Sequence, residues 1–96
     1  MNEYENVIIV KPNLGKKGLY ELKSKVENKI NEFAEITKKD DLGIKKLAYE
    51  IRKNKEGHYL IYEFKISDDL KNKAISEIER LYRITDEIMK FIIVKK

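Results

Sequence analysis

The chain has 96 residues, the size of one domain, and with 42% hydrophobic and 40% charged residues it can form one modest core under an ion-rich surface. It contains no cysteine, which excludes a disulfide framework and a thiolate metal site and fits a reducing cytoplasm. Its longest apolar runs have four residues, far short of the roughly 20 that span a bilayer. The first residues, MNEYEN, are acidic and polar and lack the pattern of a signal peptide, so we expect neither a signal peptide nor a membrane partner.

Residues 3–10, EYENVIIV, are rich in strand-forming residues and are followed by Lys11-Pro12. Proline lacks the N–H that a strand ladder needs and disfavours helical geometry in the preceding residue, so we predict a strand over 4–10. Between residues 14 and 34 the apolar residues recur at steps of three and four, which predicts a helix over 16–33. Its apolar face consists of Leu19, Leu22, Val26, Ile30 and Phe33.

A second β-rich segment covers residues 35–53 and is interrupted by Asp41-Leu42-Gly43. Glycine inside a strand pattern predicts a bulge or bend, and the aspartates before it are interpreted as turn residues. Residues 54–57, NKEG, have the length and composition of a hairpin connection. They lead to a strand predicted over 58–66, with His58 at the surface near the end of the hairpin.

Residues 67–69, SDD, are a helix-start signal, because Ser and Asp oxygens accept hydrogen bonds from the first free N–H groups of a helix. Acidic residues also favour the positive end of the helix dipole. Apolar residues then follow at helical spacing and predict a helix over 69–82. Residues 83–86 are assigned to a connector, and the last strand is predicted over 88–94.

The predicted order β-α-β-β-α-β is that of an α+β protein with the split βαβ arrangement called ferredoxin-like. Right-handed crossovers place both helices on one face of a four-stranded antiparallel sheet, with the first and third strands in its centre. We expect residues 1–96 to form a single domain with no linker or tail. The other face of the sheet is predicted to be open unless a partner covers it.

Alternation along the strands predicts which residues occupy this open face. In the third strand the set that contains Glu63 and Lys65 is the outer one, and in the fourth strand Lys90 points outward. The apolar residues assigned to the open face are Val7, Ile9, Tyr59 and Ile61. Such a patch is interpreted either as ordinary surface or as a platform for a protein or for stacked bases.

The charge is concentrated in one part of the chain. Residues 38–55 contain seven basic and three acidic residues, whereas the segments before and after them each carry equal numbers of both signs, so the whole net charge of +4 lies here. Leucine, isoleucine and tyrosine are interleaved with these basic residues. This mixture is typical of contact with a polyanion, most plausibly RNA.

Several motifs together resemble the bacterial small-subunit ribosomal protein six family. They are Tyr4-Glu5, Pro12-Asn13, Asp41-Leu42-Gly43, Lys46-Leu47-Ala48-Tyr49, Ile51, Lys53, Gly57, Tyr59-Leu60, Arg83-Ile84, Asp86 and Val94-Lys95. They occur in the order of the family and cover essentially the whole chain. Three positions depart from its pattern: Asn2-Glu3 stands where basic residues are common, Asn6 replaces an apolar residue, and Glu50 replaces a common proline.

The resemblance implies a structural protein of the small ribosomal subunit in the cytoplasm, without catalysis or a small-molecule substrate. It implies binding to the central domain of small-subunit rRNA together with small-subunit ribosomal protein eighteen. With one histidine and no cysteine, we expect no metal site and no cofactor. The residues expected to contact rRNA are Lys45, Lys46, Tyr49, Arg52, Lys53, Lys55 and Lys90. Those expected to face the protein partner are Val7, Ile9, Leu47, Ala48, Tyr59 and Ile61.

The residues alone leave other interpretations open. The lysines of the second strand could be a solvated edge that prevents aggregation, and the same edge could accept a partner segment by strand addition. The topology also occurs in RRM modules, whose strand signature residues 57–61, GHYLI, match weakly. Small acyl-phosphate hydrolases share it too, but they need an arginine that residues 11–16 lack. A regulatory domain that dimerises through its sheet is a further alternative.

Overall fold

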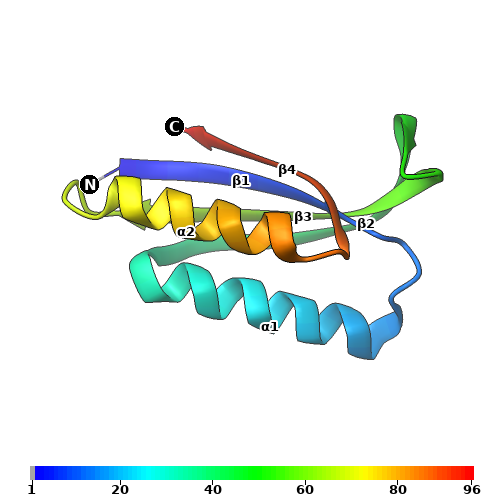
Figure 1. Ribbon diagram of the computed structural model, residues 1–96, viewed down its shortest axis with the longest axis horizontal. Coiled ribbons are helices and arrows are strands. Elements are labelled where there is room, and N and C mark those ends of the chain that lie inside the picture. The colour runs from blue at the N-terminus through cyan, green and yellow to red at the C-terminus, as the bar shows by residue number, and fades with distance from the viewer. Residues whose placement is uncertain (1) are drawn as a thin grey trace.

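The computed structural model describes residues 2–96 and shows a sheet with two helices packed on one side of it (Figure 1). In chain order the elements are β1 (Asn2–Val10), α1 (Gly15–Phe33), β2 (Glu35–Ile51), β3 (Asn54–Ile66), α2 (Lys71–Ile84) and β4 (Ile88–Lys95). Every predicted element is present, and the predicted split βαβ order is confirmed.

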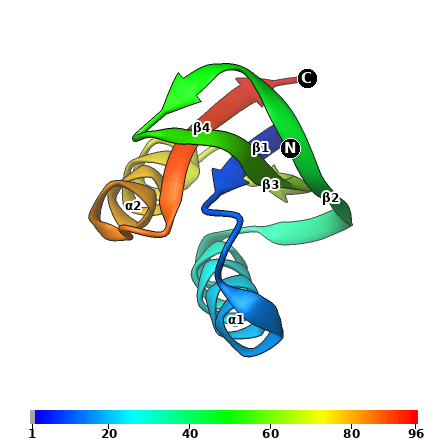
Figure 2. The same cartoon turned by 90° about the vertical axis from the view of Figure 1, so that its right-hand side faces the viewer.

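The strand order is β2-β3-β1-β4, and each neighbouring pair is antiparallel. The prediction that the first and third strands are central is therefore confirmed. Figure 2 shows both helices on the same side of the sheet, with α1 toward β2 and α2 toward β4. The opposite side carries no helix, so the sheet has an open face among the described residues.

The core lies between the sheet and the helices. Even-numbered residues of β3 from Leu60 to Ile66 are buried there, whereas odd-numbered residues from Tyr59 to Lys65 are half-buried on the open face. This alternation confirms the predicted assignment of the two faces. The helices bury Leu22, Val26 and Ile30 of α1 and Ala74, Ile78, Leu81 and Tyr82 of α2.

The start of α2 differs from the prediction. Residues 67–69 were expected to cap it, but α2 begins at Lys71, and Leu70 at the cap position makes no side-chain hydrogen bond to it. The carboxylate of Asp68 instead accepts a hydrogen bond from the side chain of Asn2 at 2.5 Å. The predicted acidic cap is wrong because this carboxylate anchors the first residue of β1.

α2 also continues further than predicted. It ends at Ile84, so Arg83 and Ile84 complete its last turn and are not part of a connector. Thr85 follows, and its buried hydroxyl donates to the carbonyl oxygen of Leu81 at 2.6 Å. Arg83 lies exposed in the last turn, where a positive charge complements the helix dipole.

The connection between β2 and β3 is shorter than predicted. Arg52 and Lys53 form a two-residue turn with φ values of 49° and 65°, and Ile51 pairs with Asn54 across it. Two positive φ values give a turn the twist that matches antiparallel strands. The side chain of Asn54 supports this turn by donating to the carbonyl oxygen of Arg52 at 3.1 Å. Residues 54–57, predicted as the connection, therefore belong to β3.

β2 is an irregular strand whose pairing with β3 shifts at three places. One shift, between Asp41 and Gly43, confirms the predicted bulge; Gly43 has a φ of 77° and its N–H donates to the Asp41 carboxylate at 2.9 Å. Another lies between Lys46 and Ile51. Figure 2 shows the end of β2 arching over the open face toward β4. We call residues 45–55 the hairpin tip.

Asn6 is fully buried on the helix side of β1. Its Oδ1 accepts a hydrogen bond from the hydroxyl of Tyr82 at 2.6 Å, and its Nδ2 donates to the backbone oxygen of Ile92 at 3.0 Å. Burial raises the pKa of Tyr82 far above its usual range, which keeps the hydroxyl protonated as a donor. This departure from the family pattern is thus a satisfied polar site that joins β1, α2 and β4.

Candidate nucleic-acid and protein interface

Four of the lysines expected to contact rRNA lie on the hairpin tip. They are exposed, and none of them takes part in the ion pairs found among residues 2–96. These residues are Lys45, Lys46, Lys53 and Lys55. The tip contains five basic residues and one acidic residue, Glu50, so it presents concentrated positive charge to solvent.

The other lysines of the basic stretch are neutralised. Lys38 lies 3.5 Å from Asp40 and 3.8 Å from Glu63. Lys39 lies 3.0 Å from Glu27 of α1. Within residues 38–55, the basic residues outside ion pairs are therefore confined to the hairpin tip.

The structure brings Tyr49 and Lys90 together, although 41 positions separate them in the chain. The Lys90 ammonium donates to the Tyr49 hydroxyl at 3.0 Å and lies 5.6 Å from the centroid of its ring. A cation over an aromatic ring is attracted by the ring's negative face. This contact joins the hairpin tip to β4 across the open face.

Two further contacts hold the tip in place. The guanidinium of Arg52 donates to the backbone oxygen of Asp86, between α2 and β4, at 2.9 Å. The amide of Asn54 lies 3.4 Å from the sulfur of Met89. Arg52, which was expected to contact rRNA, thus already has a partner within the chain.

The residues expected to face a protein partner lie together on the open face. Val7, Ile9, Tyr59 and Ile61 are half-buried there. Next to them is an open hollow of about 260 Å³, lined by Val7, Ile9, Tyr59, Lys90, Phe91 and Ile92. A smaller one of about 160 Å³ lies under the tip and is lined by Ile9, Leu47, Ala48, Tyr49, Ile51, Tyr59 and Lys90. The two share Ile9, Tyr59 and Lys90, so they adjoin.

Sequence reasoning missed the contribution of β4 to this surface. Ile92 and Val94 are half exposed on the open face, and Phe91 also lines the larger hollow. The available signal was the apolar run over 91–94 in a strand predicted to lie at an edge of the sheet.

Gly57 gives the tip room to approach the sheet. A Cβ at this buried position would lie 2.5 Å from Cγ2 of Ile9 and 3.3 Å from Cε of Met89. Glycine is needed here for space, because any side chain would push the hairpin away from β1 and β4.

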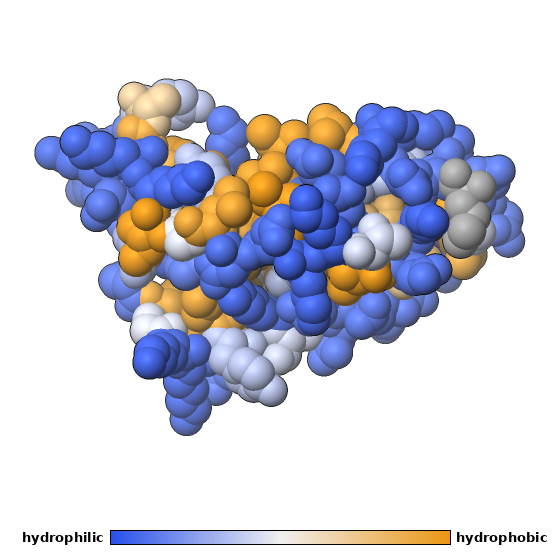
Figure 3. Space-filling model, turned by 180° about the vertical axis from the view of Figure 1, so that it is seen from behind, coloured by the Kyte–Doolittle hydropathy of each residue, from blue (hydrophilic) through white to orange (hydrophobic). Residues whose placement is uncertain are grey.

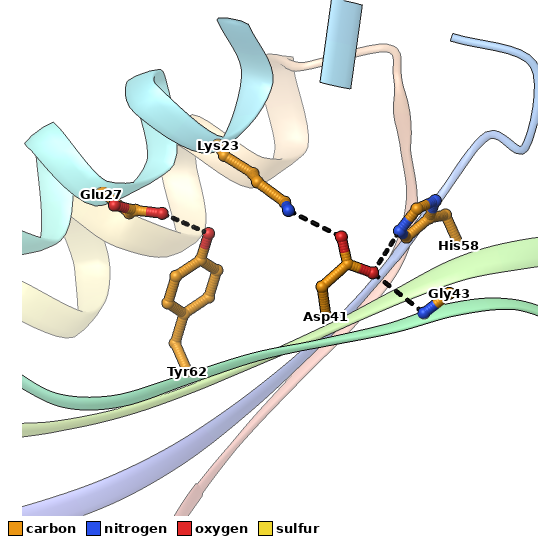
Figure 4. Close-up of polar contacts among 6 residues, drawn as sticks. All are labelled: Lys23, Glu27, Asp41, Gly43, His58 and Tyr62. Carbon is orange, nitrogen blue, oxygen red and sulfur yellow. Dashed lines mark hydrogen bonds and ion pairs between the residues drawn. The ribbon is translucent and has the colours of Figure 1, made fainter. Parts of the chain in front are cut away.

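A separate cluster of polar contacts on the helix side fixes the middle of β2 (Figure 4). The Asp41 carboxylate accepts from the Lys23 ammonium at 2.6 Å and lies 2.5 Å from Nε2 of His58. Burial alone would raise the pKa of Asp41, but the hydrogen bonds from Lys23, His58 and the Gly43 N–H outweigh it and lower the pKa to about 2. The predicted turn role of Asp41 is therefore only part of its function.

His58 and Tyr62 belong to the same cluster. His58 was predicted at the surface, but its side chain is only 16% exposed because it lies against Asp41. The Tyr62 hydroxyl donates to the carboxylate of Glu27 at 3.0 Å. Burial and the nearby carboxylate raise the pKa of Tyr62 well above its usual range. The cluster ties α1 to β2 and β3 and leaves the open face unaffected.

Within residues 2–96 no group of three or more His, Cys, Asp and Glu side chains is arranged to hold a metal ion. No helix in this part of the chain is long and apolar enough to cross a membrane.

The chain matches a known protein family, known proteins and a solved structure over nearly its whole length. A family model described as ribosomal protein S6 matches residues 3–95. The chain is 37% identical over 103 residues to small ribosomal subunit protein bS6 of Helicobacter pylori (strain Shi470), covering 99% of this chain and 65% of that protein. It is 36% identical over 96 residues to the protein of the same name from Sulfurimonas denitrificans, covering 99% and 67%. The chain thus spans about two thirds of the length of these relatives.

The fold is also that of a solved structure. The crystal structure of 30S ribosomal protein S6 from Thermotoga maritima matches with a TM-score of 0.90 and 30% sequence identity. The match covers 99% of this chain and 87% of that one.

Proposed function

Because the chain belongs to the ribosomal protein S6 family of the small ribosomal subunit, whose members are structural proteins and not enzymes, we propose that it binds the central domain of small-subunit rRNA together with small-subunit ribosomal protein eighteen. It acts within the ribosome in the cytoplasm. In this proposal the hairpin tip contacts RNA, and the open face with its hollows contacts the protein.

The unneutralised lysines of the hairpin tip support the RNA contact. An ammonium group is a point charge without a fixed fork of donors, so Lys45, Lys46, Lys53 and Lys55 would contact phosphate groups and not read bases. Such contacts release counterions, and the affinity they provide falls steeply as salt rises. Lys38 and Lys39 are paired with carboxylates and contribute little.

The apolar open face supports the protein contact. Its half-buried residues and two adjoining hollows form an apolar surface that includes Ile92 and Val94, each about half exposed. Contiguous apolar surface on a small domain marks a site of interaction with another macromolecule. RNA-binding surfaces are rich in basic residues, whereas Lys90 is the one basic residue that lines these hollows.

The RNA contact is tested by reversing charge on the tip. In a variant carrying Lys45→Glu, Lys46→Glu and Lys53→Glu, we expect weaker binding to small-subunit rRNA and a flatter dependence of log affinity on log salt. The slope should change by roughly one unit for each phosphate group that the variant no longer neutralises. A matched control reverses three exposed lysines elsewhere, Lys16, Lys17 and Lys73. Equal slopes for the two variants would contradict the assignment of the tip.

The RRM-like alternative receives little support from the sheet. An RRM stacks bases on neighbouring aromatic residues of its open face. In β3 the open-face row is Tyr59, Ile61, Glu63 and Lys65, which contains one aromatic residue. Base stacking on this face is therefore not the basis of the proposed function.

A further inference from the structure

The outer edge of β4 has no strand beside it among residues 2–96. The N–H of Lys96 donates to the oxygen of Glu3 on β1 at 2.9 Å. Because backbone groups alternate in direction along a strand, the even-numbered residues of β4 from Lys90 bond to β1. The backbone groups that face away from β1 are those of Phe91, Ile93 and Lys95.

This edge is apolar on both faces of the sheet. Ile92 and Val94 are 50% and 49% exposed on the open face, and Phe91 and Ile93 are half-buried on the helix side. Edge strands usually carry charged residues, prolines or bulges that prevent pairing with other chains. From residue 91 to residue 94 β4 has none of these, and its pairing with β1 is regular there.

The opposite edge of the sheet is protected. β2 has three register shifts along its pairing with β3, and charged side chains are frequent along it. Figure 3, which shows the molecule from behind, has several hydrophobic patches with hydrophilic side chains around and between them. Strand addition, which the sequence led us to expect at β2, fits the regular and apolar edge of β4 better.

We propose that the free edge of β4 is completed by an extended segment of a neighbouring protein, with apolar side chains on both of its faces and acidic residues at its ends. A strand ladder needs alternating N–H and C=O groups at strand spacing, which a protein backbone offers and RNA does not. The apolar side chains of this segment would cover the apolar run of β4, residues 91–94, on both faces of the sheet. Lys90 precedes this run and Lys95 follows it, so acidic flanks match both ends, whereas Lys96 already pairs with Glu63.

A second copy of this chain matches the edge poorly. Antiparallel pairing of two β4 strands would bring Lys90 and Lys95 of each copy to one ladder, and residues 88–96 contain no acidic residue. Like charges across a strand pair are destabilising. A heterologous partner avoids this repulsion. The proposal rests on the proposed function, because the small subunit is where this chain would meet such a neighbour.

Proline substitution tests the backbone contact directly. Lys95→Pro removes an N–H that faces away from β1 and leaves the ladder to β1 intact, and proline is tolerated on edge strands. Lys95→Ala is the matched control, because it removes the same charge and keeps the N–H. In competition with the wild-type chain for assembly into small subunits, we expect Lys95→Pro to be depleted at least tenfold more than Lys95→Ala. Both variants should melt within a few degrees of the wild type.

Amide hydrogen exchange gives a second readout. In purified small subunits we expect the amides of Phe91, Ile93 and Lys95 to exchange at least tenfold more slowly than in the free chain.

Normal assembly with unchanged exchange at these amides, or equal assembly of the two Lys95 variants, would overturn the proposal and leave the proposed function intact. Failure of the wild-type chain to enter small subunits would refute the proposed function, and this proposal with it. A free dimer that Lys95→Pro converts to a monomer would assign the edge to a second copy and overturn the proposal.

Discussion

The ammonium of Lys90 on β4 and the hydroxyl of Tyr49 on β2 are 3.0 Å apart, and this contact joins the two edge strands of the sheet across its open face. From the sequence, each of the two residues is predicted to contact RNA independently. In the structure they form one link, and Arg52 forms a second with the backbone of Asp86. The position of the hairpin tip over the open face therefore depends on Lys90 and Asp86, which lie far from it in the chain.

Removing the hydroxyl of Tyr49 should loosen the tip without unfolding the domain. In Tyr49→Phe the hydrogen bond is removed while the cation–π interaction remains, so we expect the stability of the tip to fall by about 0.5–1 kcal/mol. Amides of residues 47–55 should exchange with solvent about two- to fivefold faster, and amides of β1 should not change. Lys90→Met removes both interactions and should give the larger effect. Identical exchange in the tip of both variants and the wild type would show that the link does not hold it.

Two neighbouring residues of β3 test the assignment of the faces. Ile61→Asp places a charge on the open face, and we expect the melting temperature to fall by no more than a few degrees while binding of the protein partner weakens. Leu60→Asp places the same charge in the core, where Leu60 is 1% exposed, and should cost several kcal/mol and unfold the domain. Thermal melts of both variants check this, and similar melting temperatures would refute the assignment.

Asp41 should make the stability of the domain depend on acid. Its pKa is lowered from 3.8 to about 2 in the folded chain, so its contribution is complete above pH 3.8 and disappears as the pH falls through about 2. The difference corresponds to at most about 2.5 kcal/mol, and since its side chain is 35% exposed we expect about 1 kcal/mol. Asp41→Asn should lower stability at pH 6 and make little difference at pH 2.

The neighbouring aspartate gives the control for this measurement. Asp40 is exposed and lies 3.5 Å from Lys38, an ion pair of the kind that contributes little. Asp40→Asn should leave urea unfolding at pH 6 nearly unchanged. Equal effects of the two substitutions would show that the interactions of Asp41 with Lys23 and His58 do not stabilise the fold.

Gly57 should be sensitive to the addition of a single methyl group. Gly57→Ala would force its Cβ against Ile9 and Met89, and we expect a cost of about 1–3 kcal/mol in unfolding free energy. In an Ile9→Ala background the nearest atom is absent, so the same change should cost about 1 kcal/mol less. Urea unfolding of the two single variants and the double variant measures this coupling. Strictly additive effects would mean that the close approach of Gly57 to Ile9 is not what limits the side chain here.

The fold was predictable because its signals are local and periodic. The apolar stripe of α1 recurs at helical spacing, and Glu63 and Lys65 identify the outer face of β3 by simple alternation. Topology rules then place both helices on one face of the sheet. These steps need no knowledge of contacts between distant residues, and the structure confirms each of them.

The details that failed depend on contacts between distant residues. The side chain of Asp68 pairs with Asn2 rather than capping α2, and the site of His58 is set by Asp41. The turn at Arg52 and Lys53 lacks glycine, so the nearby Asn54 to Gly57 segment gave a stronger but misleading signal. The role of Gly57 is a matter of space beneath the hairpin tip, which only the folded arrangement defines.

Asn6 favours one register of β4 against β1. Its amide is satisfied only when the carbonyl of Ile92 and the hydroxyl of Tyr82 both arrive beside it. If β4 slid along β1 by one residue, every side chain of β4 would change face and the amide would have no acceptor, leaving a desolvated polar group that costs about 1–3 kcal/mol. An apolar residue at this position would tolerate such a slip more readily. The asparagine therefore penalises misaligned pairings of β4 with β1, and it favours the one alignment that places residues 91–94 along the edge of the sheet as described.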